Sequence, residues 1–243
     1  MTEGSYKQFC PVAMASEVLC THWSMMLLRE LLLGTTRFND LRRSLPRMSP
    51  ALLSKRLKDL EAAGILLRTK PAKGNDLYEY TLTEAGLALK PVVDAMGDWG
   101  HRWIATEATL GQLDVNLHMW NMRRNIDPKP MPKRRSTIQV IYSDLPAAQR
   151  NWWLLVELGD DTNLCSVDAG FDVDLYVTTD LRTMTEVWMG YMIAARVIAD
   201  GRLVLSGDRQ LERTFPIWIG SSRFAKMEKC VASRECRDCA PDP

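Results

Sequence analysis

The segment from Ser49 to Ala63, SPALLSKRLKDLEAA, constrains the fold of this chain more than any other stretch. Ser49 is a good helix N-cap, and Pro50 stands at the first helical position, where its missing N–H costs nothing. Four leucines recur at helical spacing and predict one apolar stripe: Leu52, Leu53, Leu57 and Leu60. The predicted outer face is small and basic: Ala51, Ser54, Lys55, Lys58 and, at its edge, Arg56. A helix of this kind suits either a solvated surface or a DNA groove, and its context decides between them.

Charge is concentrated around this helix. The whole chain has a formal net charge of only +1. Between Arg37 and Lys73, however, ten Lys or Arg residues stand against three Asp or Glu, an excess of seven positive charges. Such a local patch is typical of a surface that binds phosphate.

The neighbouring segments predict a winged helix. Residues 12–20, 25–33 and 38–44 are predicted helices, and residues 45–48 form a turn before the Ser49 helix, which gives a helix-turn-helix. Alternating residues in 65–70 and 77–82 predict a hairpin joined by the polar connection 71–76. Lys73 lies at the tip of this hairpin, where it can meet a phosphate.

An apolar helix follows the hairpin. Thr83 is a predicted N-cap, and Gly86 and Pro91 predict a bend. Beyond the bend, apolar residues continue as far as Ile104. This helix is too apolar for the surface of a monomer, so we expect it to pack against a second subunit.

The order of these motifs resembles the HxlR family of bacterial winged-helix regulators, which is related to the MarR group. The residues that carry the resemblance are Cys10-Pro11-Val12, the run HWSMMLLRELLLGTTRFNDLRRSLPRMSPALLSKRLKDLEAAGIL, and YEYTLTEAG. The resemblance covers about Cys10 to Trp103. It implies a dimeric transcription factor bound to double-stranded DNA at a palindromic operator. It assigns Arg42 and Arg43 to the DNA backbone, Lys73 to a wing contact, and the groove to Pro50, Ala51, Ser54, Lys55 and Arg56. Ser49 and Lys58 of the same segment are further candidate DNA contacts.

The chain length allows two domains, because 243 residues exceed the usual size of one. We expect a winged-helix domain over 1–105, a helix and a proline-rich basic linker over 106–135, and an α+β domain over 136–225. Residues 226–243 read as a flexible tail with cysteines. Strands followed by helices indicate the α+β class for the second domain.

The second domain resembles the sterol carrier protein-like fold. The residues that carry this resemblance are FDVDLYVTTDLRTMTEVWMG and DGRLVLSGDRQLERTF, within about Thr137 to Trp218. It implies a sheet covered by helices around an apolar cavity for a small hydrophobic effector. The candidate lining residues are Trp152, Trp153, Val187, Trp188, Met189, Tyr191, Met192, Ile193 and Trp218. These residues are equally suited to a filled core.

Catalytic chemistry is not indicated. The three histidines, His22, His101 and His118, show no metal-ligand spacing, and neither a P-loop nor a dinucleotide fingerprint occurs. We therefore expect neither an enzyme nor a cofactor. The polar N-terminus and short apolar runs predict a cytoplasmic protein without a membrane segment.

The cysteines suggest two further hypotheses. Cys10 precedes Pro11 at a predicted helix start, where thiol pKa values fall, and it is the redox candidate. Cys230, Cys236 and Cys239 could bind zinc, but no fourth ligand lies close to them, so we assign no metal.

Three interpretations of the whole chain remain open. In the first, the winged helix binds DNA and the second domain senses a ligand. In the second, the protein is a lipid carrier or interaction module whose winged helix serves dimerisation. In the third, the second domain of a regulator has a solid core and serves dimerisation.

Overall fold

The computed structural model describes residues 5–70, 78–159, 162–168 and 170–230. The chain forms two compact units, Met1–Asp98 and Trp99–Pro243. Within the described ranges, no helix combines the length and apolar character that a bilayer span requires.

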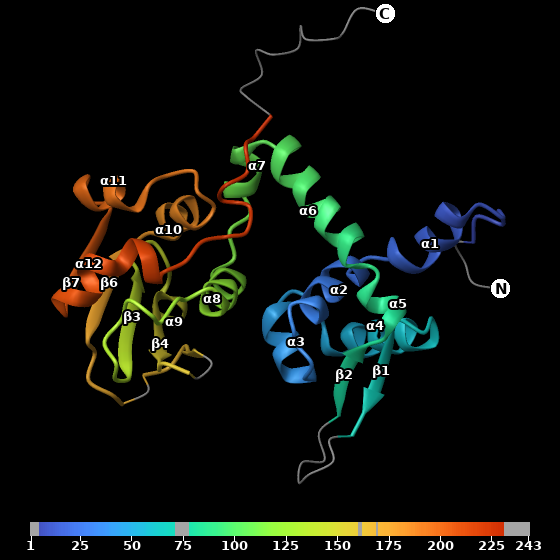
Figure 1. The fold of residues 1–243 in the computed structure, drawn as a ribbon, viewed down its shortest axis with the longest axis horizontal. Helices are drawn as coiled ribbons and strands as arrows, with labels where there is room; N and C mark the ends of the chain where they lie inside the picture. The colour runs from blue at the N-terminus through green and yellow to red at the C-terminus, as the bar shows by residue number, and fades with distance from the viewer. Residues whose placement is uncertain (1–4, 71–77, 160–161, 169, 231–243) are drawn as a thin grey trace, which may run out of the picture. The chain divides into compact units, whose positions relative to one another are not determined.

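The first unit is a winged helix-turn-helix (Figure 1). Its elements agree closely with those predicted from the sequence. They are α1 (Pro11–Leu19), α2 (Ser24–Leu32), α3 (Phe38–Ser44), α4 (Pro50–Ala62), β1 (Leu66–Thr69), β2 (Glu79–Leu82), α5 (Glu84–Leu87) and α6 (Lys90–Trp103), the last of which continues into the second unit.

Local chemistry sets both ends of α4. The Ser49 side chain accepts a hydrogen bond from Leu52 N–H at 3.2 Å, which satisfies one free donor of the first turn. Gly64 follows the helix at φ +71°, a backbone conformation that glycine adopts without steric cost. Between these ends the helix buries Leu53, Leu57 and Leu60.

The core of the first unit joins α2, α3 and α4 to the hairpin. Apolar side chains from these elements form one cluster: Leu27, Leu28, Leu31, Leu41, Leu45, Met48, Leu53, Leu57, Leu60, Ile65, Leu66 and Tyr80. This packing holds α3 and α4 at a fixed angle, because each contributes only one face to the cluster.

The hairpin is tied to the helices at both ends. The antiparallel pair β1–β2 runs from Leu66 opposite Leu82 to Thr69 opposite Glu79, and Tyr80 N–H also donates to the Thr36 carbonyl at 2.8 Å. At the base of the hairpin, a Cβ on Gly86 would lie 2.2 Å from the Ile65 carbonyl oxygen, so only glycine fits there.

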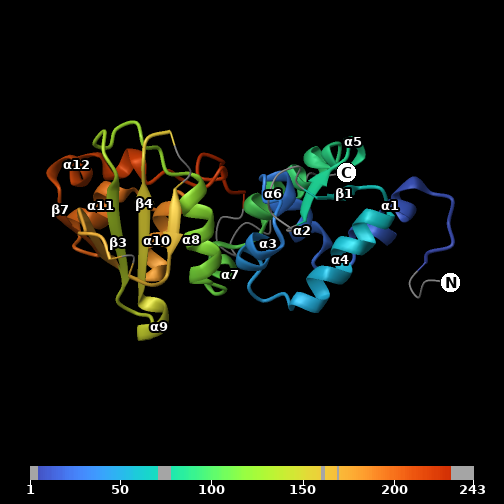
Figure 2. The same cartoon turned by 90° about the horizontal axis from the view of Figure 1, so that it is seen from below.

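The second unit is a mixed five-stranded sheet with helices on one face (Figure 2). The strands are β3 (Ser136–Tyr142), β4 (Asn151–Val156), β5 (Asn163–Cys165), β6 (Leu175–Thr179) and β7 (Leu203–Gly207), in the order β5-β4-β3-β6-β7. Strands β3 and β6 pair in parallel, and the other neighbours are antiparallel. The helices are α7 (Thr106–Leu110), α8 (Val115–Arg124), α9 (Ala147–Arg150), α10 (Leu181–Trp188), α11 (Ala194–Ala199) and α12 (Arg209–Trp218).

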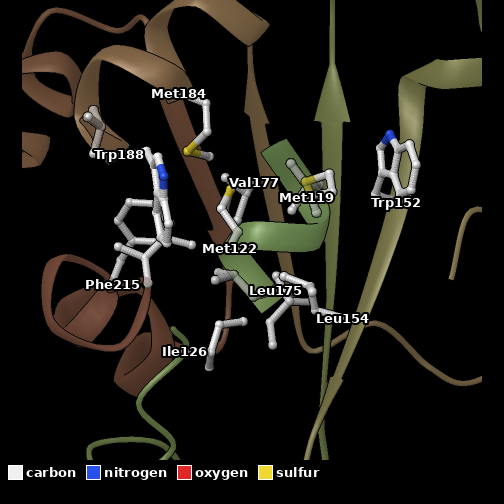
Figure 3. Packing of buried hydrophobic residues seen from close by; sticks show 14 of the residues in the cluster. Met119, Met122, Ile126, Trp152, Leu154, Leu175, Val177, Met184, Trp188 and Phe215 are labelled. Atoms are coloured by element: carbon white, nitrogen blue, oxygen red, sulfur yellow. The ribbon is translucent and has the colours of Figure 1, made fainter. Parts of the chain in front are cut away.

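One face of this sheet carries the core. Alternate strand residues, such as Leu154 on β4 and Val177 on β6, point toward α8, α10 and α12, which supply Met119, Met184 and Phe215 to the same cluster (Figure 3). This one-sided arrangement is an α+β fold, in agreement with the predicted class.

The prediction that residues 106–135 link the two domains was wrong. Residues 106–135 belong to the second unit, because Met122 on α8 and the loop residues Ile126 and Met131 are buried in its core. The loop is also held by Asp127 N–H, which donates to the Trp218 carbonyl at 2.9 Å. The prolines and charges of this loop suggested a solvated spacer, but its few apolar side chains anchor it to the sheet domain.

Candidate nucleic-acid interface

The outer face of α4 presents a stripe of small and basic residues. Ala51, Lys55 and Lys58 follow one another at spacings of four and three, so they share one side of the helix, and all three are exposed. Ser54 beside them is half-buried. Among the described residues, neither lysine has an ion pair or hydrogen bond, so both ammonium groups can bind phosphate.

Arg56 does not belong to this stripe. Its Nε donates to the His22 carbonyl at 3.1 Å, its Nη1 lies 2.7 Å from Asp59 Oδ2, and its side chain is only 15% exposed. The prediction that Arg56 contacts the DNA groove is therefore corrected, because its guanidinium is held within the protein. Arg56 borders the buried leucine stripe, and it links α4 to the connection between α1 and α2.

Helix α3 adds two arginines beside α4. Arg42 is exposed and has no partner within the described ranges. Arg43 forms an ion pair with Asp40 at 3.1 Å, but its side chain is 70% exposed, so the guanidinium remains accessible to a phosphate. Both guanidiniums are therefore accessible, and their contact with the DNA backbone stays a prediction.

The hairpin contributes a basic hollow that the sequence reasoning missed. A cavity of about 460 Å³ opens between α3 and the two strands, with Arg43, Arg68 and Tyr78 among its lining residues. The Arg68 guanidinium lies 3.5 Å from the centre of the Tyr78 ring, which orients it. The sequence signal that could have predicted this hollow is the presence of Arg68 in one hairpin segment and of Tyr78 and Tyr80 in the other. Lys73, the predicted wing contact, lies outside the described residues.

Comparison with known proteins identifies this unit. Residues 18–108 match the family described as HxlR-like helix-turn-helix. Over 98 residues the chain is 34% identical to the uncharacterized HTH-type transcriptional regulator YvaP of Bacillus subtilis (strain 168), covering 40% of this chain and 91% of YvaP. The chain belongs to the HxlR-like helix-turn-helix family.

Another relative and two solved structures are similar over a comparable share of the chain. The uncharacterized regulator YybR of Bacillus subtilis (strain 168) is 36% identical over 94 residues, which is 39% of this chain and 75% of YybR. The reduced form of YodB from B. subtilis is 31% identical, with a TM-score of 0.35, over 38% of this chain and 92% of that one. The redox regulator HypR in its reduced form is 35% identical, with a TM-score of 0.36, over 37% and 90%.

Family membership and geometry together make this HxlR-like protein a DNA-binding transcriptional regulator of MarR-like fold. The family match ends at residue 108, so it does not describe the sheet domain.

The predicted ligand-binding tryptophans of the sheet domain do not share one lining. Trp152 belongs to the core cluster, whereas Trp153, the next residue on β4, pairs with Gln139 and faces the other side of the sheet. Trp188 and Trp218 lie in the core, and Trp218 Nε1 donates to the Leu211 carbonyl at 2.8 Å. Figure 3 shows Trp188 and Trp152 at opposite ends of the cluster. Met189 and Met192 are half-buried, and both pack against the same cluster.

His118 is a polar residue in this core that the sequence reasoning did not select. Its ring is 7% exposed and lies edge-on to Tyr142 and Trp188, with centroid distances of 6.4 and 6.2 Å. Nε2 has no hydrogen-bond partner among the described residues. Burial lowers the pKa of His118 to about 3, so the ring is neutral at physiological pH.

Cys10 occupies the N-cap position of α1 and is exposed. The backbone N–H groups of Ala13 and then Val12 stabilise its thiolate and lower its pKa. Cys20, Cys165 and Cys230 are free thiols as well. No cluster of three metal-ligating side chains occurs in the described part of the chain, and Cys236 and Cys239 lie outside it.

Proposed function

We propose that this protein is a homodimeric regulator that reads a palindromic operator, with α4 of each subunit in the major groove. The observation that carries the proposal is the exposed stripe of Ala51, Lys55 and Lys58 on the second helix of a helix-turn-helix. Ala51 lets the helix approach the base edges closely, and the two lysines reach the phosphates on either side. The exposed Arg42 and Arg43 on α3 extend the same basic surface.

An uncovered apolar stripe supports the dimer. On α6, Val92, Met96, Trp99 and Trp103 recur at spacings of four, three and four, and they are 44%, 55%, 62% and 54% exposed. Helix α1 has no buried residue. Apolar surface of this extent on helices is typical of an interface between subunits.

Substitution of the lysine stripe tests the proposal. The double variant K55A/K58A should lose at least tenfold in affinity for DNA from the upstream region of its own gene. The reason is that the phosphate contacts proposed for Lys55 and Lys58 are removed from both subunits. Fluorescence anisotropy with a labelled duplex measures the affinity. The variant K226A removes an exposed lysine of the sheet domain and should bind like the wild type. Equal affinity of all three proteins would refute the proposal.

We further propose that the sheet domain is sterol carrier protein-like and senses a small apolar or amphipathic molecule. Two observations support this. Helices cover one face of the sheet, and the core contains an orphaned polar atom, His118 Nε2, among aromatic rings. A hydroxyl group on an apolar ligand can donate to this nitrogen.

A dansyl-labelled fatty alcohol, whose hydroxyl can donate to His118 Nε2, tests this second role. Binding should raise dansyl fluorescence and change the affinity for the operator duplex, whereas the variant H118F should bind the probe more weakly. If the wild type does not bind the probe, or binds it without any change in DNA affinity, the domain acts instead as a solid module for dimerisation or protein contact.

A thiol switch at Cys10 is a second candidate regulation. The exposed Cys10 thiol, whose pKa is lowered by the backbone N–H groups of Ala13 and Val12, is adjacent to the proposed dimer surface. Its oxidation by diamide to a disulfide with a second thiol would change subunit packing. Its test is a comparison of operator binding by the wild type and C10S before and after treatment with diamide.

A further inference from the structure

Strand β7 forms one edge of the sheet in the second unit (Figure 1). It pairs with β6 alone, from Leu203 opposite Thr179 to Gly207 opposite Leu175. An edge strand leaves half of its backbone N–H and C=O groups available for hydrogen bonds with another strand. Natural proteins usually cover such edges or place charged side chains along them.

The hydrogen bonds at the end of β7 show which backbone groups point outward. Asp208 N–H donates toward β6, to the Asp174 carbonyl at 2.8 Å, whereas Gly207 N–H donates to Glu212 Oε1 at 2.9 Å. Because an antiparallel strand directs its backbone groups alternately, Leu205 and Leu203 also present theirs away from β6. Outside the sheet ladder, no hydrogen bond in the described part of the chain engages the backbone of Leu205 or Leu203.

A hollow of about 450 Å³ lies along this edge, between β7, α11 and α12. Its apolar wall includes Ile198, Leu203 and Leu205, and its rim carries Arg209 and Arg213 on α12. Both arginines are exposed and have no partner among the described residues. They are four residues apart, so their side chains lie on one face of the helix.

We propose that β7 and this hollow bind an extended acidic peptide segment of a partner protein, which adds a sixth strand to the sheet. The backbone of the peptide pairs with Leu203 and Leu205. Its side chains on the helix-covered face meet the apolar wall and the two guanidiniums. Its alternate side chains lie beside Val204, which is 51% exposed on the opposite face.

Charge favours an acidic peptide over a second copy of this chain. Two β7 strands paired about a two-fold axis would bring Arg209 and Arg213 of both subunits to one seam. Glu212, the carboxylate that also lines the hollow, already accepts from Gly207 N–H. Glu212 offsets one of the two guanidinium charges, so each hollow keeps a net charge of +1 from Arg209, Arg213 and Glu212. Two such hollows repel each other and attract the carboxylates of an acidic peptide.

The probe for this surface is a fluorescein-labelled ten-residue peptide of alternating valine and glutamate, titrated with the full-length protein by fluorescence anisotropy. We expect saturable binding that R209E/R213E weakens at least tenfold. The matched variant K226E reverses an exposed charge elsewhere in the same domain and should change the affinity less than twofold. Amide hydrogen exchange at Leu203 and Leu205 should slow when the peptide is bound.

Two control peptides separate strand pairing from charge attraction alone. A peptide of alternating valine and lysine should not bind. A valine–glutamate peptide methylated on every backbone nitrogen keeps its charges but cannot donate a hydrogen bond to β7 from either edge, so it should not bind either. Equal binding of the methylated peptide would overturn the proposal. It would also be overturned if the unmethylated peptide failed to bind at millimolar concentration, or if R209E/R213E changed the oligomeric state without affecting peptide binding.

Discussion

The buried imidazole of His118 makes the stability of the sheet domain depend on pH in a defined way. Its pKa is about 3 in the folded protein, against an ordinary value of 6.5 in an unfolded chain, because burial disfavours the imidazolium. The unfolded state therefore binds a proton that the folded state does not. The contribution of this group to stability is complete above pH 6.5 and is lost as the pH falls toward 3.

The size of the effect follows from these two values. Between pH 7 and pH 5, His118 should lower the free energy of unfolding by about 2 kcal/mol, and the full loss below pH 3 is about 5 kcal/mol. The variant H118F keeps a ring against Tyr142 and Trp188 but cannot titrate. Its stability should therefore decline less than that of the wild type over this pH range.

Urea unfolding followed by tryptophan fluorescence measures this difference, because seven of the eight tryptophans lie in the second unit. The loss of stability between pH 7 and pH 5 should be about 2 kcal/mol smaller in H118F than in the wild type. The comparison removes the contribution of carboxylates that titrate in both proteins. Equal losses in the two proteins would show that His118 is not held neutral by burial.

Four further substitutions test the account of the first unit. M96E should convert the dimer to monomers in sedimentation velocity and weaken operator binding, because it places a charge in the exposed α6 stripe. S49A should cost about 1 kcal/mol of stability through loss of the α4 N-cap, and L57A about 2–5 kcal/mol through a cavity in the leucine core, both measured by thermal unfolding. C10S should bind the operator like the wild type but keep that affinity after diamide treatment, whereas oxidised wild type should not.

Local chemistry explains why so much of the first unit could be predicted from sequence. The extent of α4 follows from the Ser49 cap, the Pro50 start and the Gly64 end, and each of these acts within one turn of the helix. Helix α3 has the predicted bounds of Phe38 and Ser44. The leucine spacing also identified the buried and exposed sides of α4.

The features that depend on distant residues were not predictable in this way. Arg56 lies at the edge between the two faces of α4, and only the position of the His22 carbonyl, 34 residues earlier, shows where its guanidinium goes. Similarly, the alternation on β4 separates Trp152 from Trp153, but which face is covered depends on helices far along the chain. The loop over 125–135 looked like a linker because its contact with the Trp218 carbonyl comes from the end of the domain.

The salt dependence of operator binding tests the central claim most directly. Lys55 and Lys58 from two subunits account for four phosphate contacts, so the slope of log K against log salt should be less steep by about 3.6 in K55A/K58A than in the wild type. Anisotropy titrations over a series of salt concentrations give both slopes. A difference near this value, with sequence-selective binding by the wild type, is the result that the account predicts. Identical slopes would show that α4 does not contact DNA through these lysines and would contradict it.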